Sequence, residues 1–146
     1  MPYKETAADK TNSLMHQIIA ADLYRSGFFR PLDVDGLINK PSLLSEINYP
    51  EMTAIEAQVI TLGQIELSNN RIKVNWFLVD INKKTILTTM EFSGSISQYR
   101  AIAHKISDTI YEKITGIPGV FSTKISYISK NKGRYSLNVA DADGFN

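Results

Sequence analysis

The residue types of a hydrolytic triad occur close together where His104 is followed by Ser107 and Asp108. A nucleophilic triad needs its serine on a strained turn beside the base. All three residues fall within one predicted helix, which provides no such turn. We therefore expect His104 to flank the apolar face of that helix, where it packs and forms hydrogen bonds. We predict that the protein is not an enzyme and has no catalytic residues.

The C-terminal residues Asp141, Asp143, Gly144 and Asn146 are similar to part of a calcium-binding loop. An EF-hand loop has its glycine at position six and a bidentate glutamate at position twelve. Here the glycine comes fourth and the sequence ends, so a hairpin turn is the stronger interpretation. The chain has no cysteine and no P-loop, GxGxxG or HExxH motif. We expect neither a metal site nor a cofactor.

Basic residues and tyrosines gather near the C-terminus. They are Lys124, Tyr127, Lys130, Lys132, Arg134 and Tyr135. Basic residues with interleaved aromatics bind single-stranded nucleic acid. The formal net charge of the whole chain is only +1, which favours an ordinary exposed hairpin and no nucleic-acid partner. A nucleic-acid-binding module that uses the hairpin 124–135 stays as the alternative function.

Length and composition indicate one globular domain, or one domain with a fragment of a second. The chain has 146 residues, of which 43% are hydrophobic and 21% are charged. No apolar run approaches the roughly 20 residues that a membrane-spanning helix needs. The first five residues, Met1 to Glu5, lack the apolar region of a signal peptide.

The first predicted helix runs from Ser13 to Ser26, with Asn12 or Ser13 as its N-cap and Gly27 at its end. Asp22 interrupts its apolar face, and we expect it to pair with Arg25 at i+3. An extended segment (28–32), a mostly irregular connection (34–49) and a short helix (50–57) follow.

Three strand-like runs then predict an antiparallel meander, at 59–67, 72–81 and 85–92. Even positions of the middle run, from Ile72 to Leu78, form one continuous apolar face. Odd positions are polar at Lys73 and apolar from Phe77 onward, so half of the second face is expected to be covered as well. Phe77, Val79 and Leu87 are therefore predicted to contact a following domain, another domain or a second copy.

The clearest helix is predicted over 96–115, with a capping box at Ser95 and Gln98 and an end at Gly116. Its apolar residues recur at helical spacing: Tyr99, Ile102, Ala103, Ile106, Ile110 and Ile114. Two strands follow, at 122–129 and 134–140, and the sequence then stops within a turn. An isolated two-stranded ribbon is marginal in water, so the sequence is expected to be cut in the middle of a sheet.

The predicted fold class is α/β (α+β): two main helices packed on a mixed, partly antiparallel sheet, followed by an orphan β-hairpin. Four segments, 18–32, 103–116, 119–125 and 141–146, together resemble the TolB family of the Tol-Pal envelope system of Gram-negative bacteria. The resemblance covers nearly the whole chain.

This resemblance implies an N-terminal α/β domain over residues 1–121 and the truncated start of a C-terminal six-bladed β-propeller over 122–146. It implies that the first strand lies upstream of Met1, with Pro2 and Tyr3 as its tail. It also implies a periplasmic, non-catalytic adaptor involved in outer-membrane integrity, cell division and colicin import. In the family the propeller binds Pal and the extreme N-terminal segment binds TolA, so both binding segments are expected to lie outside this chain.

Overall fold

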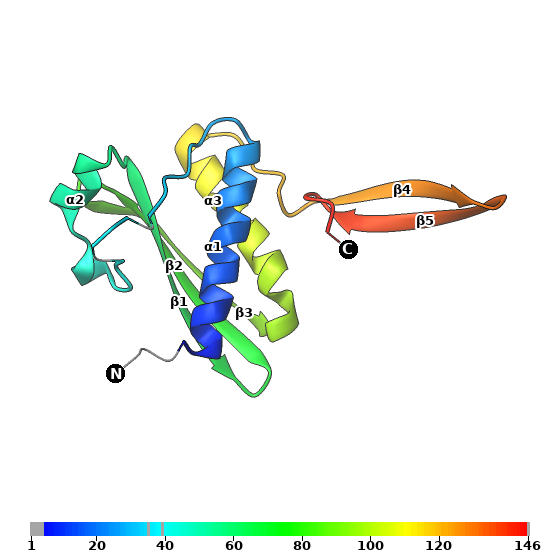
Figure 1. Ribbon diagram of the computed structural model, residues 1–146, viewed down its shortest axis with the longest axis horizontal. Coiled ribbons are helices and arrows are strands. Elements are labelled where there is room, and N and C mark those ends of the chain that lie inside the picture. The colour runs from blue at the N-terminus through cyan, green and yellow to red at the C-terminus, as the bar shows by residue number, and fades with distance from the viewer. Residues whose placement is uncertain (1–4, 35, 39, 146) are drawn as a thin grey trace.

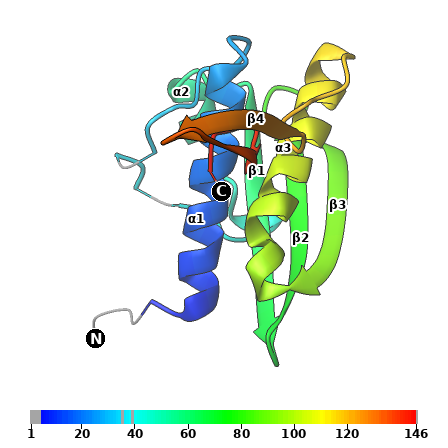
Figure 2. The same ribbon diagram turned by 90° about the vertical axis from the view of Figure 1, so that its right-hand side faces the viewer.

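The computed structural model describes residues 5–34, 36–38 and 40–145, and the predicted strand tail at Pro2 and Tyr3 lies outside them. Their helices, 3-10 turns and strands are α1 (Ala7–Arg25), η1 (Leu44–Glu46), α2 (Tyr49–Ala54), β1 (Val59–Ser68), β2 (Arg71–Asp80), β3 (Thr85–Ser95), η2 (Ile96–Gln98), α3 (Tyr99–Thr115), β4 (Lys124–Asn131) and β5 (Arg134–Asp141). Strands β1, β2 and β3 form one antiparallel sheet, with α1 and α3 side by side on one face (Figures 1 and 2). Among the described residues, β4 and β5 pair only with each other, and this ribbon projects away from the helices and the first sheet.

Helix α1 begins six residues before the predicted start, so the predicted N-cap at Asn12 or Ser13 is wrong. The N-cap is Thr6, whose side chain accepts a hydrogen bond from Asp9 N, and the Asp9 carboxylate accepts one from Thr6 N. This capping box satisfies amide groups that would otherwise lack partners at the helix start. The predicted end is confirmed, because Gly27 has a φ of 77° directly after the C-cap Ser26.

The main core lies between the sheet and the two long helices. Its buried residues are Met15, Ile19, Leu23, Ile72, Val74, Trp76, Leu78, Met90, Ile102, Ala103, Ile106 and Ile110. The predicted apolar face of β2 is thereby confirmed. Trp76 is fully buried and lies opposite Gly63 of β1, where an added Cβ would come within 2.1 Å of the indole ring. Glycine at this position therefore leaves the space that the tryptophan occupies.

The second face of the sheet is covered at one end, as predicted, but the cover comes from the chain's own residues. Ile47 and Met52, from α2 and the segment before it, pack with Leu62, Val79 and Ile81. Val79 is 1% exposed, which leaves it almost no surface for a partner. Phe77 packs on the edge of this cluster and stays half-buried, so its contact with a partner remains a prediction.

Leu87 lies on the opposite face from the one we predicted. The pairing between β2 and β3 shifts at Leu78 and Val79, which face Thr88 and Ile86 respectively, so Leu87 is the extra residue of a bulge. A bulge reverses the alternation of side chains beyond it. Leu87 therefore packs against the main core, and the half-exposed Ile86 shares the second face with Val79.

Candidate functional site

Helix α3 carries two stripes of side chains with different contacts. The buried stripe, which includes Ile102 and Ile106, packs on the sheet. The second stripe, here called the polar stripe, consists of Arg100, His104, Asp108 and Tyr111. Steps of four, four and three residues place these side chains along one side of the helix. All four side chains approach the segment from Gly119 to Phe145, so the stripe positions the end of the chain.

Asp108 and Tyr111 fix the connection between α3 and the ribbon. The Asp108 carboxylate accepts hydrogen bonds from the backbone amides of Phe121, at 2.6 Å, and Ser122, at 3.2 Å. The ring of Tyr111 meets that of Phe121 edge to face, with 5.7 Å between centroids. An added Cβ on Gly119 would lie 2.5 Å from the Asp108 Cα. The close approach of this connection to α3 therefore requires glycine at position 119.

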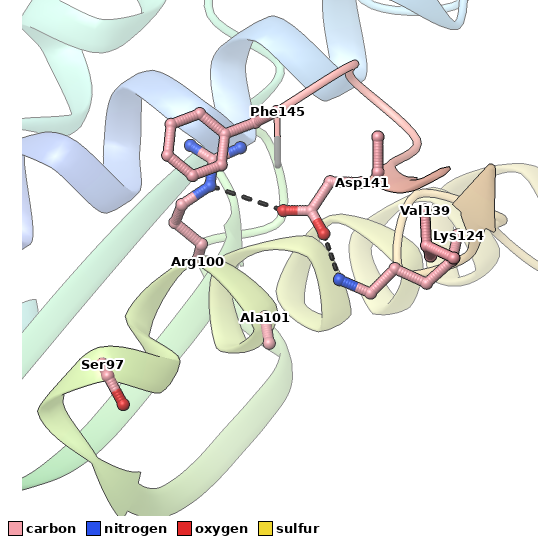
Figure 3. Close-up of a pocket in the computed structure, with 8 residues that line it drawn as sticks. Ser97, Arg100, Ala101, Lys124, Val139, Asp141 and Phe145 are labelled. Carbon is pink, nitrogen blue, oxygen red and sulfur yellow. Dashed lines mark hydrogen bonds and ion pairs between the residues drawn. The ribbon is translucent and has the colours of Figure 1, made fainter. Parts of the chain in front are cut away.

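Arg100 binds the turn at the base of the ribbon. Its Nη2 lies 2.5 Å from the Asp143 carboxylate, and its Nε lies 3.5 Å from that of Asp141. The guanidinium also stacks on the ring of Phe145, 3.9 Å from its centroid. Lys124 pairs with the same Asp141 from β4 (Figure 3). One arginine of α3 therefore contacts three residues of this turn, which spans residues 141–145 and is here called the terminal turn.

His104 connects the terminal turn to α1. Its Nδ1 lies 2.7 Å from Oδ2 of Asp22, and both side chains are at most 3% exposed. Arg25 pairs with the other oxygen of Asp22, which confirms the predicted ion pair. The predicted packing and hydrogen-bonding role of His104 is also confirmed. On its other side, His104 Nε2 lies 3.6 Å from Asp143 Oδ2 and 3.9 Å from Asp141 Oδ2.

The two carboxylates of the terminal turn are held in their ionised form. The hydrogen bond from Lys124 lowers the pKa of Asp141 below its usual range. Burial acts to raise the pKa of Asp143, but hydrogen bonds from the Phe145 amide and from Arg100 outweigh it, and the net direction is downward. Both aspartates are therefore anionic at neutral pH and hold the surrounding cations.

The residues considered for catalysis have structural roles. Ser107 is buried and its hydroxyl donates to the carbonyl of Ala103. The Asp108 carboxylate faces the connection to the ribbon, so His104, Ser107 and Asp108 form no triad. The predicted turn at 141–145 is confirmed, because Gly144 has a φ of 86° and its amide donates to the Asp141 carbonyl at 2.8 Å. Asn146 lies outside the described residues.

The contacts of Arg100 and His104 with Asp141 and Asp143 are not among the sequence-based predictions. The i, i+4, i+8 spacing of Arg100, His104 and Asp108 is the one available signal. It indicates a polar side of α3, but it does not say which segment lies against that side.

The fold and this site define a small α+β domain whose last helix holds the segment that follows it. Comparison with known proteins identifies the family. The model of the TolB amino-terminal domain matches residues 1–87, and the chain belongs to this family. The chain therefore contains a TolB amino-terminal domain, which is a domain of Tol-Pal system proteins.

Individual relatives agree with this assignment. The chain is 52% identical over 130 residues to the Tol-Pal system protein TolB of Methylobacillus flagellatus, covering 88% of this chain and 30% of that protein. It is 41% identical over 143 residues to TolB of Thiobacillus denitrificans, covering 97% and 33%. The crystal structure of TolB from Acinetobacter baumannii superposes with a TM-score of 0.76 at 30% identity, over 89% of this chain and 33% of that one. The chain therefore spans about a third of the length of the relatives it matches.

None of the helices in the described part of the chain combines the length and the apolar composition that spanning a membrane requires.

Proposed function

We propose that this chain is a non-catalytic adaptor domain that acts in the periplasm and holds the following part of its protein in a fixed orientation. The polar stripe of α3 carries this proposal. Asp108 binds the connection at residues 121 and 122, and Arg100 binds the terminal turn at Asp141 and Asp143. Two anchors on one helix restrain both position and rotation, whereas a single anchor would leave the ribbon free to turn.

The domain boundary proposed from the sequence fits this arrangement, with residues 1–121 as an α/β adaptor and 122–146 as the start of a propeller. One face of the ribbon carries Ile128, Leu137 and Val139, which are 70%, 74% and 56% exposed. Apolar residues exposed to this extent on a two-stranded sheet are typical of a surface that packs against further structure. This chain spans about a third of the relatives' length, which supports the proposal that further structure of this kind belongs to proteins of the family.

By family resemblance, the partners of the whole protein are Pal and TolA, and its roles are outer-membrane integrity, cell division and colicin import. These partners and roles belong to the proposal. We expect the chain alone to bind neither Pal nor the C-terminal domain of TolA, because the resemblance assigns those binding segments to other parts of the protein.

Distance measurements between spin labels test the adaptor proposal. The chain has no native cysteine, so Lys10→Cys in α1 and Lys132→Cys at the tip of the ribbon place two labels without background. We expect a single narrow distance distribution. The double substitution of Arg100 and Asp108 by alanine should broaden it, while the matched substitution Thr109→Ala on the same helix should not. A broad distribution in the otherwise unchanged chain would refute a fixed orientation.

A further inference from the structure

His104 presents an unpaired nitrogen to two carboxylates. Among the described residues, its Nε2 is buried and has no hydrogen-bond partner, although Asp141 and Asp143 lie on that side of the ring. We propose that His104, Asp141 and Asp143 bind a divalent transition-metal ion of the zinc class, with Asp22 orienting the imidazole. This site departs from the sequence-based expectation of no metal, and it does not rest on the adaptor proposal.

The contact between Asp22 and His104 orients the ring for metal binding. Asp22 is 1% exposed and accepts from His104 Nδ1 at 2.7 Å. A carboxylate at one ring nitrogen is the usual second contact of a metal-binding histidine, because it fixes the tautomer and makes the other nitrogen more basic. With the proton held at Nδ1, the lone pair of Nε2 points toward Asp141 and Asp143.

The distances on the Nε2 side suit metal coordination better than a direct hydrogen bond. Nε2 lies 3.6 Å and 3.9 Å from the two Oδ2 atoms. A charge-assisted N–H···O contact is about 2.7–2.9 Å long. Two ligands of a tetrahedral ion with bonds of about 2.1 Å are separated by roughly 3.4 Å. The ligand atoms of His104, Asp141 and Asp143 all lie within 4.8 Å of one another.

The donor set selects a class of ion. One imidazole nitrogen and two carboxylate oxygens are the ligands that Zn²⁺ and neighbouring divalent ions accept. Calcium prefers six to eight oxygen ligands, which this cluster does not provide. The absence of cysteine from the chain leaves the two histidines as its only side chains with strong nitrogen or sulfur donors for such an ion.

Two cations compete with a metal for these carboxylates. Arg100 contacts the same Oδ2 atoms that face His104, and Lys124 pairs with Oδ1 of Asp141. With Asp22 and Arg25 included, three carboxylates face three cations, so the cluster is neutral when His104 is neutral. A dication must therefore displace side-chain charge. Lys124 can move away readily, since its side chain is 61% exposed, and Arg100 is the stronger competitor at 17% exposed.

Titration calorimetry with ZnCl₂ on the tag-free chain tests the site, with CoCl₂ absorption as a second readout of coordination. We expect one ion per chain. His104→Asn should abolish binding, and the matched variant His16→Asn should keep it. Asp22→Asn should weaken binding by roughly 10–100-fold, since it removes the orienting carboxylate. Arg100→Gln should strengthen binding by at least about tenfold, because it removes a charge beside the ion.

Circular dichroism tests whether each variant is folded. If His104→Asn does not fold, Asp143→Asn takes its place. Binding that persists in both His104→Asn and Asp143→Asn would overturn the proposal. Absence of binding in both the unchanged chain and Arg100→Gln would also overturn it. A ¹⁵N spectrum showing His104 protonated on both nitrogens and unchanged by Zn²⁺ would assign the cluster to an imidazolium instead.

Discussion

The two sheets of this protein differ in how they use apolar side chains. In the first sheet, Trp76 and Leu78 are fully buried beneath α1 and α3. In the ribbon, Tyr135 and Leu137 are 70% and 74% exposed. The same residue types thus stabilise one sheet through their packing and add little to the other. The ribbon depends instead on its backbone pairing and on the polar contacts of Arg100, Asp108 and Lys124.

The largest expected effect separates the two sheets directly. Trp76→Ala should lower the free energy of unfolding by about 3–5 kcal/mol, because it leaves a large cavity in the main core. The matched variant Tyr135→Ala should change it by less than about 0.5 kcal/mol. Urea denaturation followed by circular dichroism measures both. Equal losses in the two variants would mean that the ribbon packs on the helices in solution.

The pH dependence of stability tests burial beside Trp76. The ring of His16 lies 4.4 Å from that of Trp76, and burial lowers the pKa of His16 from 6.5 to about 4. The unfolded chain therefore takes up this proton more readily than the folded one. The contribution of neutral His16 to the free energy of unfolding is complete above about pH 6.5. It is lost as pH falls toward 4, by up to about 3 kcal/mol. His16→Gln should flatten the stability profile over this range, and an unchanged slope would contradict the assignment.

A smaller effect is expected at the connection between the sheets. Asp108→Ala leaves the amides of Phe121 and Ser122 without their acceptor, which should cost about 1–2 kcal/mol. Amide hydrogen exchange should accelerate at these two residues and leave the core strands unaffected. Thr109→Ala serves as the control, because the Thr109 hydroxyl donates to the carbonyl of Lys105 within α3. Unchanged protection at Phe121 in Asp108→Ala would show that other contacts hold the connection.

The smallest expected effect is that of a leucine substitution in the ribbon, compared with one in the first sheet. Leu137→Ala in the ribbon should change the free energy of unfolding by less than about 0.5 kcal/mol, since the side chain is already exposed. Leu78→Ala on the first sheet should cost about 2–5 kcal/mol. A loss above about 1 kcal/mol at Leu137 would indicate that the ribbon is covered, as by pairing between two copies.

Sequence patterns predicted the parts of this structure that depend on local periodicity. The alternation from Ile72 to Leu78 located the buried face of β2. The start of α1 was missed because Thr6 and Asp9 precede any apolar residue of the helical stripe. Leu87 was misplaced because a bulge of one residue leaves no mark in the sequence.

The candidate site could be predicted only where its contacts are local. Asp22 and Arg25 are three residues apart, and their ion pair follows from helical geometry. The contact between Asp22 and His104 spans 82 residues and depends on how α1 and α3 pack together. The meeting of Arg100 with Asp143 depends further on the path of the connection and the ribbon. No spacing rule within one element encodes either contact.

The imidazole of His104 lies between the first helix and the last turn of the described chain. A mechanical load applied at Phe145 would reach α3 through Arg100, which binds Asp141 and Asp143, and would reach α1 through the contact of His104 with Asp22. The pairing of the three-stranded sheet would bear that load only after the contacts of the polar stripe had separated. Under tension the contacts of the two helices would therefore break before the hydrogen bonds of the sheet beneath them.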